Sequence, residues 1–172
     1  DGSSDNNFDP VNDQTVSVST TDNDTAGFTI AQTDGSTSVS ESGSTDTFTV
    51  VLNAQPNSNV VLAVTSGDTG EATVNSPLTF TNENWNTPQT VTVTGANDSI
   101  IDGTINSTIT VSVVDVSSDD NFDAVANQTV SVSTTDNDTA GFTIAQSGGS
   151  TSVAETGTTD TFTVVLDAQP DS

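Results

Sequence analysis

The chain has 172 residues with 24 Asp and Glu and no Lys, Arg or His, so its formal net charge is −24. Without cationic side chains there is no internal salt bridge, no phosphate clamp and no electrostatic attraction to nucleic acid or an anionic membrane surface. The absence of Cys and Met also excludes disulfides, thiolate chemistry and soft-metal sites. The composition favours cations as partners, and we expect neither nucleic acid binding nor direct membrane contact.

Short runs of alternating apolar and polar residues predict β-strands along the chain. In chain order the runs cover residues 27–31, 37–39, 47–52, 60–64, 72–74, 78–80, 90–94, 108–113 and 129–133. In the third run, Phe48 and Val50 fall on one face and Thr47 and Thr49 on the other, as in a sheet with one solvated side. Turn-forming residues separate the runs. We predict an all-β fold, an immunoglobulin-like (Greek-key) β-sandwich with about seven or more strands.

An internal repeat of 114 residues divides the chain, because residues 1–58 and 115–172 are identical at 46 of 58 aligned positions. A period this long is typical of a whole domain rather than a solenoid unit. We therefore expect β-sandwich repeats in tandem. Residues 25–138 form a complete repeat, residues 1–24 the last loop and strand of a preceding repeat, and residues 139–172 the first two strands of a following one.

The two end pieces are incomplete sandwiches and leave unpaired strand edges. We expect them either to be held by a neighbouring copy of the molecule, through complementation or strand exchange, or to belong to a continuous filament. Adjacent repeats of the same chain are therefore expected partners.

Acidic residues gather in the loops at both ends of the expected sandwich. In a seven-stranded sandwich whose strands are lettered A to G in chain order, one end gathers the A–B, C–D and E–F loops and the end of strand G. We call this end the first pole. Its acidic residues are Glu41, Asp68, Glu71, Asp98, Asp102, Asp136 and Asp138. The other end, the opposite pole, holds Asp119, Asp120 and Asp123 beside Asp22 and Asp24 of the preceding repeat.

Clustered carboxylates predict a hard divalent cation, because neighbouring like charges oppose ionisation. Ca²⁺ takes about six to eight oxygen ligands in flexible geometry and fits best, with Mg²⁺ second. The alternative is that these acids are solvated loop residues that keep the protein soluble. A contiguous EF-hand beginning at Asp22 fails because Ala26 and Thr33 occupy ligand positions. Any calcium site must therefore be assembled from separate loops.

Residues 78–95 and the acidic stretch 97–103 resemble a known family. Phe80, Trp85 and the Pro88-Gln89 pair, followed by the acidic stretch, are similar to the Calx-β-like repeats of very large bacterial surface proteins, and most to the extender modules of RTX-type adhesins. The resemblance implies calcium at the first pole, held by Glu41, Asp68, Asp98, Asp102, Asp136 and Asp138, with Asp22, Asp24 and Glu155 as equivalents in the flanking copies. Asn97 departs from the family pattern, in which that place is often acidic.

The function that the resemblance implies is structural. Such repeats are extracellular spacers at the cell surface, stiffened by calcium, that project an adhesive region and serve adhesion and biofilm formation. The alternatives are a repeat of an extracellular filament or matrix protein, or a module that binds a glycan or partner. We expect no enzyme, because only carboxylate pairs remain as catalytic groups and they need a cleft.

Overall fold

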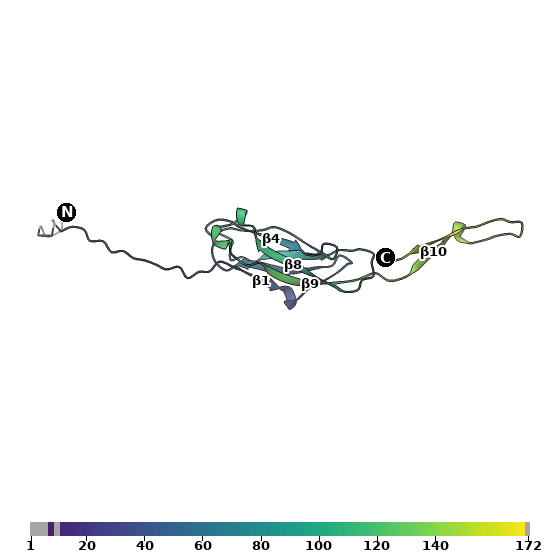
Figure 1. The fold of residues 1–172 in the computed structure, drawn as a ribbon, viewed down its shortest axis with the longest axis horizontal. Coiled ribbons are helices and arrows are strands. Elements are labelled where there is room, and N and C mark those ends of the chain that lie inside the picture. The colour runs from purple at the N-terminus through teal and green to yellow at the C-terminus, as the bar shows by residue number, and fades with distance from the viewer. Residues whose placement is uncertain (1–6, 9–10, 171–172) are drawn as a thin grey trace.

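The protein is all-β in the computed structural model, which describes residues 7–8 and 11–170 (Figure 1). Two sheets form a sandwich-like body between an extended N-terminal segment and a C-terminal hairpin. The expected end pieces 1–24 and 139–172 lie partly outside the described residues, at 1–6, 9–10 and 171–172. No helix in the described part of the chain has the length and apolar character of a membrane span.

The first sheet has the strand order β1-β3-β7-β5 and is antiparallel throughout. Its strands are β1 (Phe28–Gln32), β3 (Thr45–Leu52), β5 (Ala72–Val74) and β7 (Gln89–Gly95).

The second sheet has the order β2-β9-β8-β4-β6, with one parallel pair, β2 and β9. Its strands are β2 (Thr37–Ser40), β4 (Val60–Ser66), β6 (Leu78–Phe80), β8 (Ile105–Val113) and β9 (Gln128–Thr135). Short 3-10 turns lie at η1 (Thr33–Gly35), η2 (Asp115–Ser117) and η3 (Asp120–Phe122).

The core lies between the two sheets and comes from the alternating positions of their strands. Phe48 and Val50 of β3 are fully buried, as are Ile109 and Val111 of β8. Burying each such side chain stabilises the fold by about 1.5–3 kcal/mol. The predicted alternation is confirmed, since Thr47 and Thr49 are only half-buried.

All nine predicted strand runs correspond to strands of the sandwich, within a few residues at their ends. Phe80 is fully buried, and Trp85 is half-buried and packs against the same core. Both aromatic residues therefore contribute to the packing of the sandwich.

The C-terminal hairpin repeats the beginning of the sandwich. Strand β10 (Phe142–Gln146) pairs with β11 (Phe162–Leu166), with η4 (Ser147–Gly149) between them. Phe142 pairs with Leu166 as Phe28 pairs with Leu52, so the register is the same 114 residues later. Both strands are exposed along their length. Complementation by a neighbouring copy stays a prediction.

Candidate metal centre

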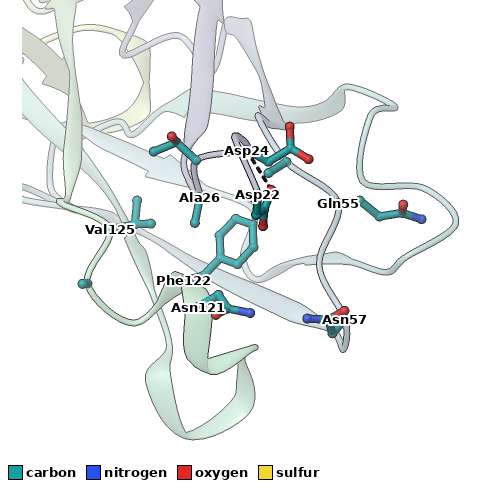
Figure 2. Close-up of a pocket in the computed structure, with 11 residues that line it drawn as sticks. Asp22, Asp24, Ala26, Gln55, Asn57, Asn121, Phe122 and Val125 are labelled. Atoms are coloured by element: carbon teal, nitrogen blue, oxygen red, sulfur yellow. Dashed lines mark hydrogen bonds between the residues drawn. The ribbon is translucent and has the colours of Figure 1, made fainter. Parts of the chain in front are cut away.

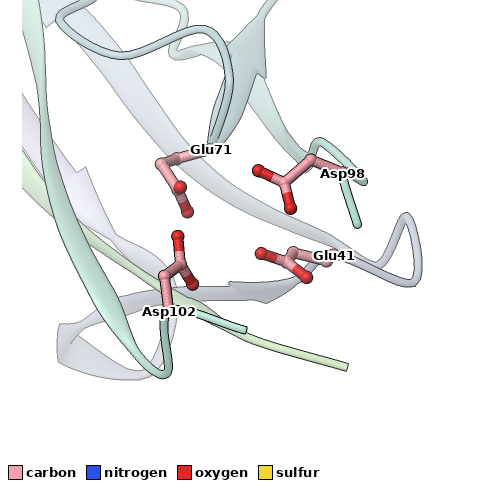
Figure 3. A group of neighbouring side chains, drawn as sticks. All are labelled: Glu41, Glu71, Asp98 and Asp102. Carbon is pink, nitrogen blue, oxygen red and sulfur yellow. The ribbon is translucent and has the colours of Figure 1, made fainter. Parts of the chain in front are cut away.

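Four carboxylates converge at the first pole from three different loops, and we call them the four-carboxylate group: Glu41, Glu71, Asp98 and Asp102. Glu41 follows β2, Glu71 precedes β5, and both aspartates belong to the β7–β8 loop. One oxygen of each lies within 4.8 Å of one oxygen of every other member, and the side chains point toward a common centre (Figure 3).

Strand pairing fixes the backbones of the two glutamates. The Glu41 N–H donates to the Thr135 carbonyl across 3.1 Å and so continues the pairing of β2 with β9. The Glu71 carbonyl accepts from the Ala96 N–H across 2.8 Å, just beyond the end of β7. Both carboxylates are therefore held by the sheets and are buried, with exposed fractions of 1% and 7%.

A glycine permits this arrangement. Gly95 lies so close to the backbone of Ser40 that a Cβ atom would overlap the Ser40 carbonyl oxygen. Only a residue without a side chain lets β7 approach the end of β2 at this point. Glu41 is the next residue after Ser40, so the contact fixes the backbone from which its carboxylate extends.

A second group, the junction group, consists of Glu41, Asp136 and Asp138, with ligand oxygens again within 4.8 Å of one another. Asp136 and Asp138 follow β9 and lead toward the hairpin. The Asn137 N–H between them donates to Glu41 Oε2 across 3.3 Å. Glu41 therefore belongs to both groups and links the sandwich to the segment that leaves it.

The electrostatics of the first pole are unfavourable for the metal-free protein. Burial raises the pKa of Glu41 above its ordinary value of 4.5. The hydrogen bond from the Asn137 N–H opposes this increase, and the charges of Asp136, Asp98 and Asp102 add to it. Burial also raises the pKa of Glu71, with the charge of Asp102 as the next cause. Two ionised carboxylates about 5 Å apart repel by about 3 kcal/mol at an effective dielectric constant of about 20.

Two buried oxygens of the groups have no hydrogen-bond partner, Glu71 Oε2 and Asp138 Oδ2. Buried polar atoms are almost always hydrogen-bonded, and an orphaned one suggests an ion or water that completes it. By contrast, Asp136 accepts from the Gly103 N–H across 2.9 Å and from the Asp138 N–H across 2.6 Å. These hydrogen bonds lower the pKa of Asp136 and keep it ionised.

The carboxylates of the four-carboxylate group and the junction group fit a hard cation. Every ligand that they offer is a carboxylate oxygen, and the residues come from segments that are far apart in sequence. Two of these residues, Glu41 and Glu71, are buried. Ca²⁺ accepts such a set in flexible geometry, whereas Mg²⁺ requires a near-ideal octahedron.

Asp68, a predicted ligand, lies at the first pole but outside both groups. Its side chain is exposed, and Oδ1 accepts from the Gly70 N–H across 3.0 Å. Glu71, which the sequence places at this pole but which the family resemblance does not imply as a ligand, takes the inward position instead. The start of a strand at Ala72, whose side chain is buried, was the sequence signal that the chain turns into the core there.

At the opposite pole, Asp119 is held by the protein itself. Its carboxylate accepts from the N–H groups of Asn57 and Ser58, at 2.6 and 2.9 Å, and from both the backbone and the side chain of Asn121. These hydrogen bonds lower the pKa of Asp119. The carboxylate fixes the β3–β4 loop against the β8–β9 loop.

The remaining predicted ligands lie outside the two groups. Asp120 and Asp123 are exposed at η3 and its end, where partial desolvation and the charge of Asp115 raise the pKa of Asp123. Asp22 and Asp24 are exposed beside the same loop and line a cavity with Asn121 and Phe122. Glu155 is exposed in the hairpin. Within residues 7–8 and 11–170, the structure brings three or more carboxylates together only at the first pole.

Comparisons with known proteins give no family for the chain. No protein-family model matches it, and no curated protein sequence matches it. Among solved structures, the E. coli chaperone DraB is similar over 67% of this chain and 59% of its own, at 9% identity and a TM-score of 0.45.

Two further structures are similar in part. Domains 1–6 of the surface layer protein SbsC match 90% of this chain at 20% identity and a TM-score of 0.45, and the chain spans 23% of that structure. SSP-19, an MSP-domain protein-like family member of Caenorhabditis elegans, matches 59% of this chain and 92% of its own at 16% identity and a TM-score of 0.38. Similarities this weak establish no family and no function.

Proposed function

We propose that the chain is part of a calcium-stiffened extracellular spacer built of tandem sandwich repeats. The observation that carries the proposal is the four-carboxylate group, in which the buried Glu41 and Glu71 face Asp98 and Asp102 in a chain that has no cationic side chain. A chain that buries acids together without a counter-charge requires a cation from solution to relieve their repulsion.

Calcium is the favoured ion because the oxygens come from four side chains on three loops and include an orphaned buried oxygen of Glu71. Bound Ca²⁺ would contact Glu41, Glu71, Asp98 and Asp102, with water completing its coordination. A second ion at the junction group would contact Glu41, Asp136 and Asp138.

The junction group supports the mechanical part of the proposal. Asp136 and Asp138 precede the hairpin by only a few residues, so an ion held by them and by Glu41 would join the sandwich to the start of the next repeat. Ion binding stabilises the ordered conformation of the segment that it holds. The junction would then be stiff with calcium and free to bend without it.

The strand order supports the finer classification as an immunoglobulin-like, Calx-β-like repeat. The order β1-β3-β7-β5 matches the ABED sheet of such sandwiches, and β9-β8-β4 matches their GFC sheet. Two strands are added to this second sheet, β2 beside β9 and β6 beside β4. Together with the sequence resemblance, this order is the basis for proposing an extender module of a large RTX-type surface adhesin.

Thermal unfolding of the full chain tests the proposal, in millimolar CaCl₂, in MgCl₂ and in EDTA, with ion counting by calorimetry. One calcium site at a hundred times its Kd contributes about 2.7 kcal/mol, which raises Tm by about 10 °C for a domain of this size. Magnesium should give a smaller rise. Equal Tm values in calcium and EDTA would overturn the proposal and leave the acids as solubilising residues.

A further inference from the structure

A cavity of about 500 Å³ lies at the opposite pole, where the preceding segment enters the sandwich (Figure 2). Its wall is mixed, with apolar side chains beside carboxylates and amides. The residues that matter here are Asp22, Asp24, Ala26, Gln55, Phe122 and Val125.

Part of the same wall recurs at the other end of the chain, because of the 114-residue repeat. Asp136 and Gln169 are the counterparts of Asp22 and Gln55. The contacts that Asp136 and Gln169 make with the sandwich therefore indicate which part of one repeat lies beside this wall of the next repeat.

The β7–β8 loop of the sandwich contacts both counterparts. The Gln169 N–H donates to the Ser99 carbonyl across 2.6 Å, and Ile100 forms a parallel β-bridge with Gln169. The Gly103 N–H donates to Asp136 Oδ2 across 2.9 Å. Two residues of the repeated wall are thus bound by one loop of the repeat before it.

Ile101 lies between these contacts in the sequence and is 42% exposed, an apolar side chain in a polar loop. The residues that would correspond to Phe122 and Val125 in a following repeat lie beyond residue 172. We propose that the cavity at the opposite pole receives the Ile100-Ile101 tip of the β7–β8 loop of the preceding repeat. The inference rests on the tandem arrangement in the proposed function, and it does not require calcium.

Docking of this tip gives each junction an apolar contact besides the acidic one. The β-bridge aligns the loop with the β3–β4 loop of the next repeat. The isoleucine side chains would leave water against the half-buried Ala26 and Val125, beside the buried Phe122. The β7–β8 loop then serves both contacts, because Asp98 and Asp102 of the same loop belong to the four-carboxylate group.

A two-repeat chain tests the inference, made of residues 1–170 followed by residues 57–138. Pro170 is the counterpart of Pro56, so this chain keeps the present junction and completes the second sandwich. The protein has no cysteine, so a single introduced thiol reports its own accessibility. Ile101→Cys is placed in the first repeat, where a following repeat covers it, or in the second repeat, where nothing follows.

We expect labelling by a maleimide to be at least about tenfold slower in the first repeat than in the second repeat or in the 172-residue chain. Val116→Cys in the first repeat gives the rate of an open thiol, since Val116 is 97% exposed. Val125→Asp in the second repeat should restore fast labelling, whereas Val125→Asp in the first repeat should not. Equal rates at the two Ile101 positions would overturn the inference.

An unmodified contact provides the second measurement, because Ile101→Cys itself shortens the side chain. In the two-repeat chain with methyl-labelled isoleucine, an NOE is expected between Ile101 of the first repeat and Phe122 of the second. Its absence would overturn the inference.

Both measurements are made in calcium and in EDTA, together with Tm. Protection of Ile101 without a calcium-dependent Tm supports the docking and overturns the calcium spacer. A calcium-dependent Tm with Ile101 open in both conditions supports the spacer and overturns the docking.

Discussion

The backbone N–H of Asn137 donates to the buried carboxylate of Glu41 across 3.3 Å. The residue that leaves the sandwich is thereby bound to the carboxylate that the four-carboxylate group and the junction group share. Substitution at Glu41 should therefore affect both the stability of the sandwich and its response to metal.

Glu41→Gln should abolish most of the calcium-dependent rise in Tm. In EDTA the same variant should be more stable than the wild type, because a neutral amide removes a buried charge and leaves an oxygen that accepts from Asn137. Differential scanning calorimetry in both conditions measures the two effects. Glu83→Gln, at an exposed acid outside both groups, is the control and should change neither. A full calcium response in Glu41→Gln would contradict the assignment.

Metal-free stability should fall as pH rises above about 4.5. The folded protein raises the pKa of Glu41 and Glu71 above 4.5, so it binds their protons more tightly than the unfolded chain does. The stability from these protons is fully present below 4.5 and is lost as pH rises through the raised pKa values.

Calcium should reverse this trend, since its ligands must be deprotonated. The lowered pKa of Asp119 acts in the other direction, and its contribution is lost as pH falls below 3.8. Urea unfolding between pH 3 and 8, in EDTA and in calcium, checks both slopes. A metal-free stability that rises steadily through pH 5–7 would contradict the raised pKa values.

Asp119→Ala should lower the free energy of unfolding by about 1.5–3 kcal/mol, the range for hydrogen bonds to a charged group. The N–H groups of Asn57 and Ser58 lose their acceptor in this variant. The loss should be the same in calcium and EDTA, because the carboxylate binds the protein's own donors. Asp120→Ala, at the exposed neighbour, should be nearly neutral. A loss seen only with calcium would instead identify Asp119 as a metal ligand.

Gly95→Ala should destabilise the protein by about 1–3 kcal/mol or more, as overpacking does. The new methyl group overlaps the Ser40 carbonyl oxygen and displaces the chain just before Glu41, so calcium affinity should fall with stability. Gly27→Ala is the control, since its Cβ would meet only the movable end of the Asn53 side chain. Calorimetric titration of both variants compares the affinities. Unchanged calcium affinity in Gly95→Ala would indicate that Glu41 is not a ligand of the calcium site.

The sequence was sufficient to predict the strands, and it indicated two acidic poles, of which the structure brings carboxylates together only at the first within the described residues. Alternation at Phe48 and Val50 is a local property, and strand order alone brings loops to a common end. Which acids turn inward could not be predicted, because the direction of a side chain in a loop depends on the path of the whole chain. Asp68 and Glu71 lie in one loop, and only the path of the chain into β5 decides which points inward.

The burial of Asp119 is a second feature that the sequence did not indicate. As a sequence element it resembles Asp120 and Asp123, which are exposed, yet it is buried with 5% exposure. The difference arises from two backbone N–H groups near residue 57, about sixty positions earlier, whose direction depends on the turn of the β3–β4 loop. Composition therefore does not distinguish a carboxylate that accepts hydrogen bonds from the backbone from one that is a candidate metal ligand.

The matching registers of β1–β3 and β10–β11 have a consequence for how such a protein folds. Chains built of nearly identical units are prone to pair a strand with its twin in the neighbouring copy. The pair β10–β11 reaches the register of β1–β3 as a two-stranded sheet within residues 142–166. Such local pairing has a small loop-closure cost, which favours its formation ahead of long-range contacts. In the proposed tandem arrangement, each unit would thus pair its first two strands with each other before the competing copy leaves the ribosome.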